Sequence, residues 1–303
     1  MRLTVVGSGP AAPQADTPAS GLLVESVSTA VLLDCGSGVV SRLRTVADPG
    51  ALSGVVIGHF HADHYIDLAA LRYLYPWPGT GHDRPAIWLP PGGPDRMRTL
   101  AGLISERERF FDDAFDLFEY ADGVPFTIGD LTIRPTLLQH YVPARAMAVS
   151  GDDGASRLIY GGDTGPTETL VEIASGADLL IAEATLASPA EDEVVRGHST
   201  AEEAIAMARR AGAARLVLTH YPSARRPVLQ ALAASTRDLA VDVAHPGLRV
   251  EVRPQRTGAR SPGPAGAIST DTRSGSRRPA DPMRARMTSD LGSSPSNPSA
   301  VRQ

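Results

Sequence analysis

Short runs of apolar and β-branched residues, each bounded by Gly, Pro or Asp, recur along the chain. Runs of this length and composition are typical of strands in a buried sheet. The pattern predicts strands at residues 3–6, 29–33, 54–57, 86–89, 131–134, 158–160, 179–181 and 215–218.

Stretches with helical spacing of apolar residues lie between several of these strands. They cover residues 38–45, 67–73, 94–104, 168–174, 200–211 and 226–235. The stretch 200–211 is the best marked, because Ser199 and Thr200 offer an N-cap hydroxyl and Gly212 follows its last turn. Strands that alternate with helices predict an α/β fold with a largely buried sheet.

The composition changes at Pro254. In residues 254–303, 21 of the 50 residues are Pro, Gly or Ser, and the large apolar residues are few and unspaced. A segment of this kind cannot bury enough apolar surface to offset the entropy lost on ordering. We therefore predict one folded domain over residues 1–253 and a disordered tail over residues 254–303.

Charge is unevenly distributed between these two parts. The tail has eight Arg and three Asp, a formal +5, so the whole-chain charge of −5 leaves −10 for residues 1–253. An acidic surface of this kind repels polyanions. Cys35 is the only cysteine, which excludes an internal disulfide and a Cys-rich metal site.

The start of the chain, MRLTVVGSGP, has only a short apolar run, without the longer apolar core and cleavage site of a signal peptide. No run of about 18 apolar residues occurs elsewhere in the sequence. We therefore expect a cytoplasmic protein that does not associate with a membrane.

The strongest local signal is the segment HFHADH at residues 59–64, which directly follows a predicted strand. Three imidazoles and one carboxylate in so short a segment are typical of metal ligands. The spacing of His59 and His61 allows both to bind one divalent ion such as zinc, and Asp63 and His64 are left for a second ion. Histidines without a ligand are the alternative, which this density disfavours.

The segment 59–64 matches the HxHxDH motif of the metallo-β-lactamase superfamily. Further ligand types follow in the order of that family, with His140 in LLQHYVPA, Asp163 in YGGDTGP and His220 in RLVLTHYPS. The chain resembles this superfamily over about residues 1–250. The resemblance implies a four-layer αββα sandwich.

The resemblance also implies two divalent metal ions joined by a bridging hydroxide. Zn²⁺ is the expected metal and Mn²⁺ the alternative, because mixed imidazole and carboxylate ligands accept both. Two ions lower the pKa of the bridging water and can clamp the oxygens of a phosphoryl displacement. By the resemblance, one ion is bound by His59, His61 and His140, the other by Asp63, His64 and His220, and both by Asp163.

Two further motifs, EATL at residues 183–186 and GHST at residues 197–200, resemble the paired motifs of the ribonuclease Z group. In that group a histidine near the metals, supported by a carboxylate, protonates the leaving oxygen. The resemblance implies catalytic roles for Asp63 at the metals, for His198 as general acid and for Glu183 as its supporting carboxylate. The alternative is that His198 only precedes a helix N-cap.

The paired motifs indicate phosphodiester substrates. Ribonuclease Z enzymes have a basic, Gly-rich arm that grips tRNA, and the stretch from Asp163 to His198 has no such insertion. The chain also resembles an actinobacterial group of small proteins similar to cyclic-nucleotide phosphodiesterases. We therefore expect hydrolysis of a small phosphodiester, 3′,5′-cyclic AMP to 5′-AMP, by attack of the metal-bridging hydroxide.

Two alternatives remain open. One is a ribonuclease Z-like tRNA 3′-endonuclease, which the acidic charge of residues 1–253 disfavours. The other is a metal-containing binding module without turnover, which the full set of ligand types disfavours. A homodimer is compatible with the resemblance, since related folds often dimerise, but no stretch of the sequence defines an interface.

Overall fold

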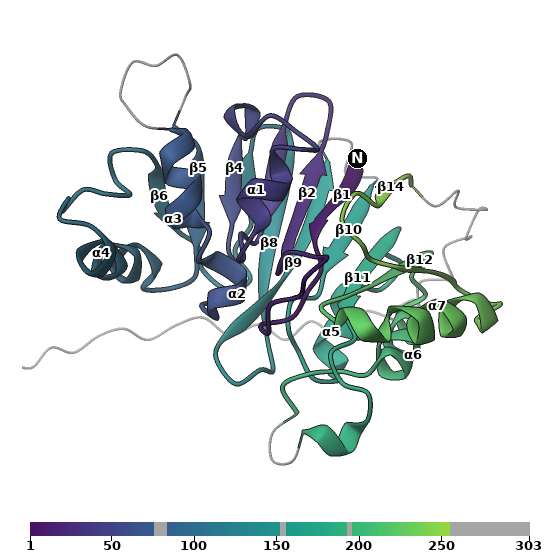
Figure 1. Ribbon diagram of the computed structural model, residues 1–303. Helices are drawn as coiled ribbons and strands as arrows, with labels where there is room; N and C mark the ends of the chain where they lie inside the picture. The colour runs from purple at the N-terminus through teal and green to yellow at the C-terminus, as the bar shows by residue number, and fades with distance from the viewer. Residues whose placement is uncertain (76–83, 152–155, 193–195, 255–303) are drawn as a thin grey trace, which may run out of the picture. The chain divides into compact units, whose positions relative to one another are not determined.

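A computed structural model of the chain describes residues 1–75, 84–151, 156–192 and 196–254, all of which belong to one unit. Two seven-stranded sheets lie face to face, with helices on the outer side of each (Figure 1). This arrangement confirms the expected αββα sandwich. Apart from Pro254, the tail predicted at residues 254–303 lies outside the described residues.

The first sheet has the strand order β14-β1-β2-β3-β4-β5-β6. Strands β3 to β6 are parallel, and the other neighbours are antiparallel. The strands are β1 (Arg2–Gly7), β2 (Gly21–Glu25), β3 (Ala30–Leu33), β4 (Gly54–Val56), β5 (Ala86–Leu89), β6 (Asp116–Glu119) and β14 (Arg249–Glu251).

The second sheet has the order β13-β12-β11-β10-β9-β8-β7. Its strands are β7 (Phe126–Ile128), β8 (Leu131–Leu138), β9 (Ala144–Gly151), β10 (Arg157–Tyr160), β11 (Leu179–Glu183), β12 (Arg215–Thr219) and β13 (Ala240–Val243). Strands β10 to β13 are parallel, and β8 and β10 both run antiparallel to β9. The carboxyl ends of β8, β10, β11 and β12 therefore all lie at the same end of this sheet.

Each sheet is covered by its own helices. The helices α1 (Val39–Leu43), α3 (Leu68–Leu71) and α4 (Gly93–Ile104) pack on the first sheet, and α5 (Glu168–Ile173), α6 (Ala201–Ala211) and α7 (Arg226–Ser235) pack on the second. The short helix α2 (Ala62–Tyr65) follows β4 at the end of the sheet. Single 3-10 turns occupy Pro49–Ala51, Arg72–Leu74, Pro189–Glu191 and Ser223–Arg225.

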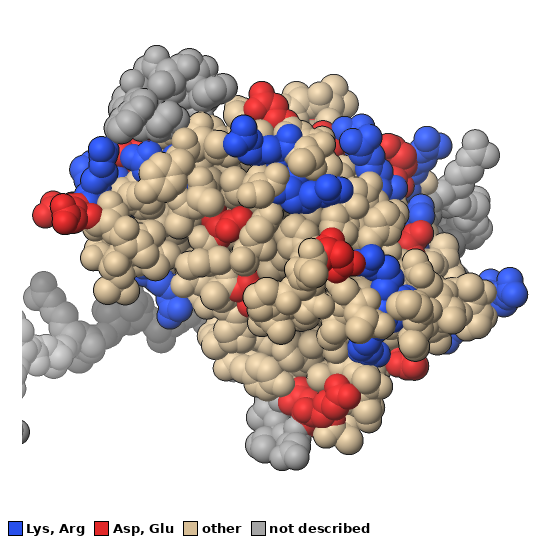
Figure 2. Space-filling view, viewed as in Figure 1, with Lys and Arg blue, Asp and Glu red and all other residues tan. Residues whose placement is uncertain are grey.

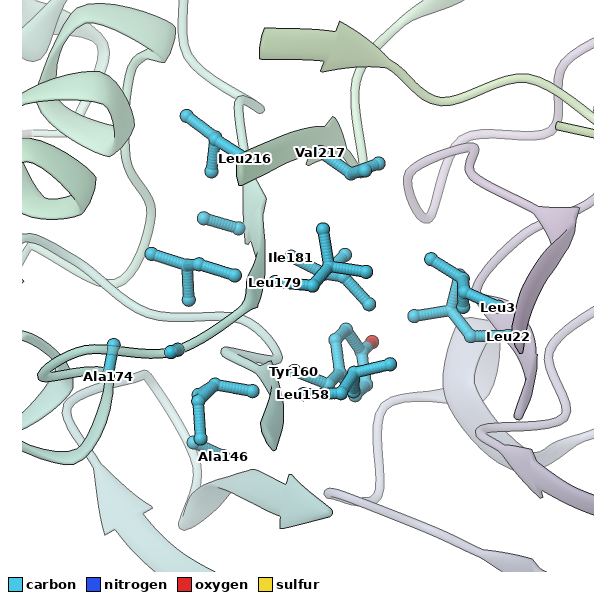
Figure 3. Close-up of a cluster of buried hydrophobic side chains, with 14 of the residues drawn as sticks. Leu3, Leu22, Ala146, Leu158, Tyr160, Ala174, Leu179, Ile181, Leu216 and Val217 are labelled. Carbon is cyan, nitrogen blue, oxygen red and sulfur yellow. The ribbon is translucent and has the colours of Figure 1, made fainter. Parts of the chain in front are cut away.

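The alternation of side chains along the strands produces two apolar cores. In β2, Leu22 lies in the core between the sheets, whereas Leu23 lies in the core under the helices of the first sheet. In Figure 3, Leu3 and Leu22 of the first sheet face Tyr160 and Ile181 of the second. Both faces of the first sheet are thus buried, which agrees with the continuous apolar runs of the sequence.

The predicted helix at 200–211 is confirmed in its details. Thr200 is the N-cap, and its side chain accepts a hydrogen bond from the Glu203 amide while the Glu203 carboxylate accepts one from the Thr200 amide. Gly212 ends the helix in the left-handed conformation, with φ of 63°. The segment before this helix carries His198, so the cap also fixes where that residue emerges.

The sequence pattern does not predict β2, β6, β7, β9, β13, β14 or the helix α2. Four of the missed strands lie at sheet edges, namely β6, β7, β13 and β14. Strand β6 is largely exposed, and the other three are short. Strand β9 contains the charged residue Arg145, which interrupts the apolar pattern; it is buried, and its pair with the Asp122 carboxylate offsets the cost of burial. No helix among the described residues is both long enough and apolar enough to cross a bilayer.

Candidate metal centre

Seven His and Asp side chains converge where strands of both sheets end. The first sheet contributes the segment after β4, and the second contributes the segments that follow β8, β10 and β12. These residues are His59, His61, Asp63 and His64 from the first sheet, and His140, Asp163 and His220 from the second. The sequence motifs, which lie up to 161 positions apart (residues 59 and 220), are thus brought together in space.

One group comprises His59, His61, His140 and Asp163, with one ligand atom of each within 4.8 Å of the others. The Nε2 atoms of His59 and His140 each lie 3.1 Å from Nδ1 of His61. Nδ1 of His140 donates a hydrogen bond to the Gly197 carbonyl at 2.7 Å, which leaves its Nε2 lone pair facing the group.

A second group comprises Asp63, His64, Asp163 and His220, again with ligand atoms within 4.8 Å. Nε2 of His220 lies 3.1 Å from Oδ2 of Asp63 and 3.3 Å from Oδ2 of Asp163. Asp163 belongs to both groups, as expected for a carboxylate between two ions.

The residues fit divalent cations in their chemistry. Oδ1 of Asp163 is buried and has no hydrogen-bond partner among the described residues. A buried carboxylate oxygen without a partner is costly, and a cation would satisfy it. Imidazoles and carboxylates together suit zinc and related ions.

The pKa shifts of His59, His140 and Asp163 also favour cation binding. Burial lowers the pKa of His59 well below its usual value and that of His140 to about 4, so both imidazoles are neutral near pH 7. Burial alone would raise the pKa of Asp163, but the nearby His220 and His64 outweigh it and lower that pKa. Neutral imidazoles and an ionised carboxylate are the forms that bind metals.

Asp34, which sequence reasoning did not single out, supports the centre from behind. Its Oδ1 accepts a hydrogen bond from the Gly58 amide at 2.8 Å, and its Oδ2 accepts from Nδ1 of His64 and from the Tyr160 hydroxyl, both at 2.7 Å. The bond to His64 directs Nε2 of that ring toward Asp163. The one sequence signal for Asp34 is its place directly after β3.

Backbone strain is concentrated at this centre. Among the described residues, the non-glycine residues with clearly positive φ are Asp34 at 60° and His220 at 52°. This left-handed conformation is unfavourable for residues with a side chain, and such outliers cluster at functional sites. One of these two residues belongs to the centre and the other contacts it through His64, so the strain marks this part of the fold as a functional site.

His198 and Glu183 lie beside the second group. Nδ1 of His198 is 2.9 Å from Oε1 of Glu183, whose carboxylate is buried and also accepts the Thr164 amide at 2.7 Å. Burial lowers the pKa of His198, but the hydrogen bond and charge of Glu183 outweigh burial, and the net effect raises this pKa. The backbone amide of His198 is held by Asp192, a further residue that the sequence did not reveal.

A cavity of about 350 Å³ opens over these residues. Its lining includes His61, Asp63, Asp163, His198 and His220. Every residue predicted for metal binding or catalysis is therefore in the centre or in direct contact with it, since Glu183 contacts His198.

Comparison with known proteins agrees with this fold and site. Residues 29–221 match the family model described as "Beta-lactamase superfamily domain". The chain belongs to this superfamily.

Among individual relatives, the chain is similar to three bacterial proteins. It is 36% identical over 228 residues to "Uncharacterized protein Rv1339" of Mycobacterium tuberculosis, covering 73% of this chain and 81% of the relative. Identity to "Probable metallo-hydrolase YhfI" of Bacillus subtilis is 30% over 226 residues, covering 73% and 87%. Identity to "Ribonuclease Z" of Mycobacterium bovis is 30% over 282 residues, covering 84% and 100%.

A solved structure of the Bacillus subtilis relative shows the same architecture. The crystal structure of the metallo-β-lactamase fold protein YhfI superimposes with a TM-score of 0.71 at 26% identity, covering 82% of this chain and 99% of that chain. The four-layer sandwich is thus the metallo-β-lactamase fold.

Proposed function

We propose that this chain is a two-metal phosphodiesterase that hydrolyses 3′,5′-cyclic nucleotides, cyclic AMP to 5′-AMP. The observation that carries the proposal is the pair of His/Asp groups that share Asp163 beneath a cavity also lined by His198. The similarity to a protein named as a metallo-hydrolase supports a hydrolytic reaction.

In this proposal, His59, His61 and His140 bind one divalent ion, Asp63, His64 and His220 bind a second, and Asp163 binds both. Two ions held there would lower the pKa of water and stabilise charge on the phosphoryl oxygens. The ligand chemistry supports zinc, with manganese as the alternative.

The protein's own part in the reaction is orientation and proton transfer. With Nδ1 of His198 held by Glu183, Nε2 is the ring nitrogen left to serve the substrate. A protonated His198 would donate to O3′ as the bond from phosphorus to O3′ breaks. Glu183 contributes by keeping this ring oriented and by favouring its imidazolium form.

The size of the cavity supports a small substrate. About 350 Å³ is near the lower end of the range for small-molecule sites, roughly 300–1,000 Å³. On the face seen in Figure 2, Arg side chains are interspersed with Asp and Glu and do not form one continuous basic surface. Phosphate contacts dominate the affinity of nucleic-acid-binding proteins, so this face offers no continuous basic surface for a tRNA backbone.

A tRNA 3′-endonuclease is the second candidate, favoured by the 30% identity to a ribonuclease Z along that protein's whole length. Against it, the described part of residues 164–197 consists of α5, β11 and one 3-10 turn with their connections, which do not resemble a substrate-gripping arm.

The test compares two substrates with the purified full chain loaded with Zn²⁺ or Mn²⁺. We expect release of 5′-AMP from 3′,5′-cyclic AMP and no trailer release from a 3′-extended tRNA precursor. Cleavage of the tRNA alone would replace this proposal by the endonuclease. Bound metal with no cleavage of either substrate, or of bis(p-nitrophenyl) phosphate, would indicate a binding module.

A further inference from the structure

The hydroxyl of Thr185 lies between two residues to which the proposed function gives separate roles. Its Oγ1 is 2.5 Å from Oε2 of Glu183, the partner of His198, and 2.8 Å from Nδ1 of His220. It also lies 2.8 Å from the His220 carbonyl oxygen. The one hydroxyl proton of Thr185 therefore has three possible acceptors.

The direction of these hydrogen bonds follows from what each group can donate. A carboxylate only accepts, so the short contact to Glu183 requires Thr185 to donate its proton there. A charged acceptor at 2.5 Å also competes better for that proton than the neutral carbonyl at 2.8 Å. Oγ1 is then free to accept a hydrogen bond from Nδ1 of His220.

With a cation between His220 and the two Asp residues, this arrangement favours one tautomer of His220. With its proton on Nδ1, the ring has its lone pair on Nε2, which faces Asp63 and Asp163 at 3.1 and 3.3 Å. In the opposite tautomer Nε2 would carry a proton and could not bind a metal ion. The ligand-competent form of His220 thus depends on the Thr185 hydroxyl.

The backbone places Thr185 for this purpose. Glu183 pairs with Thr219 in the register of β11 and β12. The segments that follow these two strands carry Thr185 and His220 and therefore start side by side. Arg225 donates to the carbonyls of Ala184 and Thr185 at 3.0 and 3.1 Å, which anchors the loop after β11.

We propose that Thr185 is a positioning residue through which the Glu183 carboxylate holds His220 in its metal-binding tautomer. One buried carboxylate then serves two parts of the site, orienting His198 directly and His220 through Thr185. This inference rests on the proposed function, because it takes His220 as a ligand of the second ion.

The test compares Thr185→Val, which has nearly the same shape without the hydroxyl, with Thr185→Ser, which keeps it. Thr219→Val is the matched control, because it removes a hydroxyl from the strand residue directly before His220. Metal affinity is measured by competition with a chromophoric zinc chelator. Supporting partners of metal ligands typically contribute about 10–100-fold in affinity. We expect Thr185→Val to lower the affinity for one of the two zinc ions by that factor. The Thr185→Ser and Thr219→Val proteins should bind both ions with the affinity of the wild type.

A second measurement follows the Nδ1 proton of His220 directly. Long-range ¹H–¹⁵N spectra of the zinc-loaded protein, labelled at histidine, should show an Nδ1 proton on His220 that exchanges slowly with solvent in the wild type and in Thr185→Ser, because Oγ1 accepts it. In the Thr185→Val protein this proton should exchange faster. Catalysis plays no part in this readout.

The outcomes separate the two proposals. If the wild type binds two zinc ions and Thr185→Val binds both equally well, the role of Thr185 is refuted and the proposed function stands. If Thr185→Val and Thr219→Val weaken binding alike, the effect is general packing and the inference is wrong. If the wild type does not bind two ions, the proposed function itself fails.

Discussion

Asp34 illustrates how a single residue can organise a centre that it does not enter. Its two carboxylate oxygens receive three donors, from Gly58, His64 and Tyr160. In Asp34→Asn one of the two carboxylate oxygens is replaced by an NH₂ group, which only donates. At least one of the three donors would then face another donor instead of an acceptor.

We expect Asp34→Asn to weaken metal binding by about 10–100-fold, since it removes the orientation of His64. Titration with zinc in the presence of a competing chelator measures this. Asp67→Asn is a suitable control, because it is the same substitution at a carboxylate outside the two His/Asp groups. The Asp67 carboxylate accepts the Val40 amide at the start of α1. Equal affinity in Asp34→Asn and wild type would show that His64 is oriented without Asp34.

For His198, removal of the ring should affect substrates according to their leaving groups. We expect His198→Ala to keep its metals and to lose about 10²–10⁴-fold in turnover of cyclic AMP, because the leaving O3′ needs a proton. Bis(p-nitrophenyl) phosphate, whose leaving group departs without one, should be affected far less. His245→Ala, at an exposed histidine, is the control. A similar loss on both substrates would contradict the role of general acid.

Sequence reasoning reached the residues whose chemistry is visible in a local motif. His59 to His64 form one contiguous segment, and His140, Asp163 and His220 each follow a recognisable strand. Thr185 lies in the EATL motif and Asp34 follows a predicted strand, but the sequence does not reveal their roles, because these come from contacts with residues far along the chain, such as the Asp34 bond to Tyr160. Asp192 holds this segment through the backbone amides of Gly197 and His198, and backbone amides carry no sequence signal.

At the scale of elements, the signals that were read correctly are those that local physics determines. Helix α6 has its capping box and its terminal glycine, and the parallel strands β4, β10, β11 and β12 are short apolar runs. Helix α2 spans four residues, too few to show a helical period, although it carries Asp63 and His64. The edge strands β6, β7, β13 and β14 have three or four residues each and bury at most one of them, so their apolar pattern is too short to recognise.

The cap of α6 gives a prediction for stability. Thr200→Ala leaves the Glu203 amide without its hydroxyl acceptor and should lower the free energy of unfolding by about 1 kcal/mol. Thr200→Ser should keep most of this stability. Urea unfolding followed by circular dichroism measures both variants, and equal midpoints for Thr200→Ala and wild type would argue that the cap does not stabilise the fold.

At the scale of the whole molecule, the centre joins the two sheets. In the proposed function each ion has ligands from both, because His59 to His64 follow the first sheet and His140, Asp163 and His220 follow the second. A cation bound there would act as a cross-link that only the folded state provides.

Removal of metal should therefore lower thermal stability. A ligand present at about 100 times its dissociation constant stabilises the folded state by about 2.7 kcal/mol. We expect chelation to reduce the Tm of the full chain and added Zn²⁺ to restore it, as measured by scanning calorimetry. A Tm that does not respond to either treatment would be evidence against binding between the sheets.

The order of strands along the chain has a practical consequence. Apart from β14, the first sheet is built from residues 2–119 and the second from residues 126–243, and the exposed residues 121–125 connect them. Dividing the gene within 121–125 would give two fragments, neither of which contains either His/Asp group complete. Strand β14 in the second fragment would still find its partner β1 in the first. Recovery of hydrolysis on mixing would then report that two polypeptides have met, which makes this fold a candidate for fragment complementation.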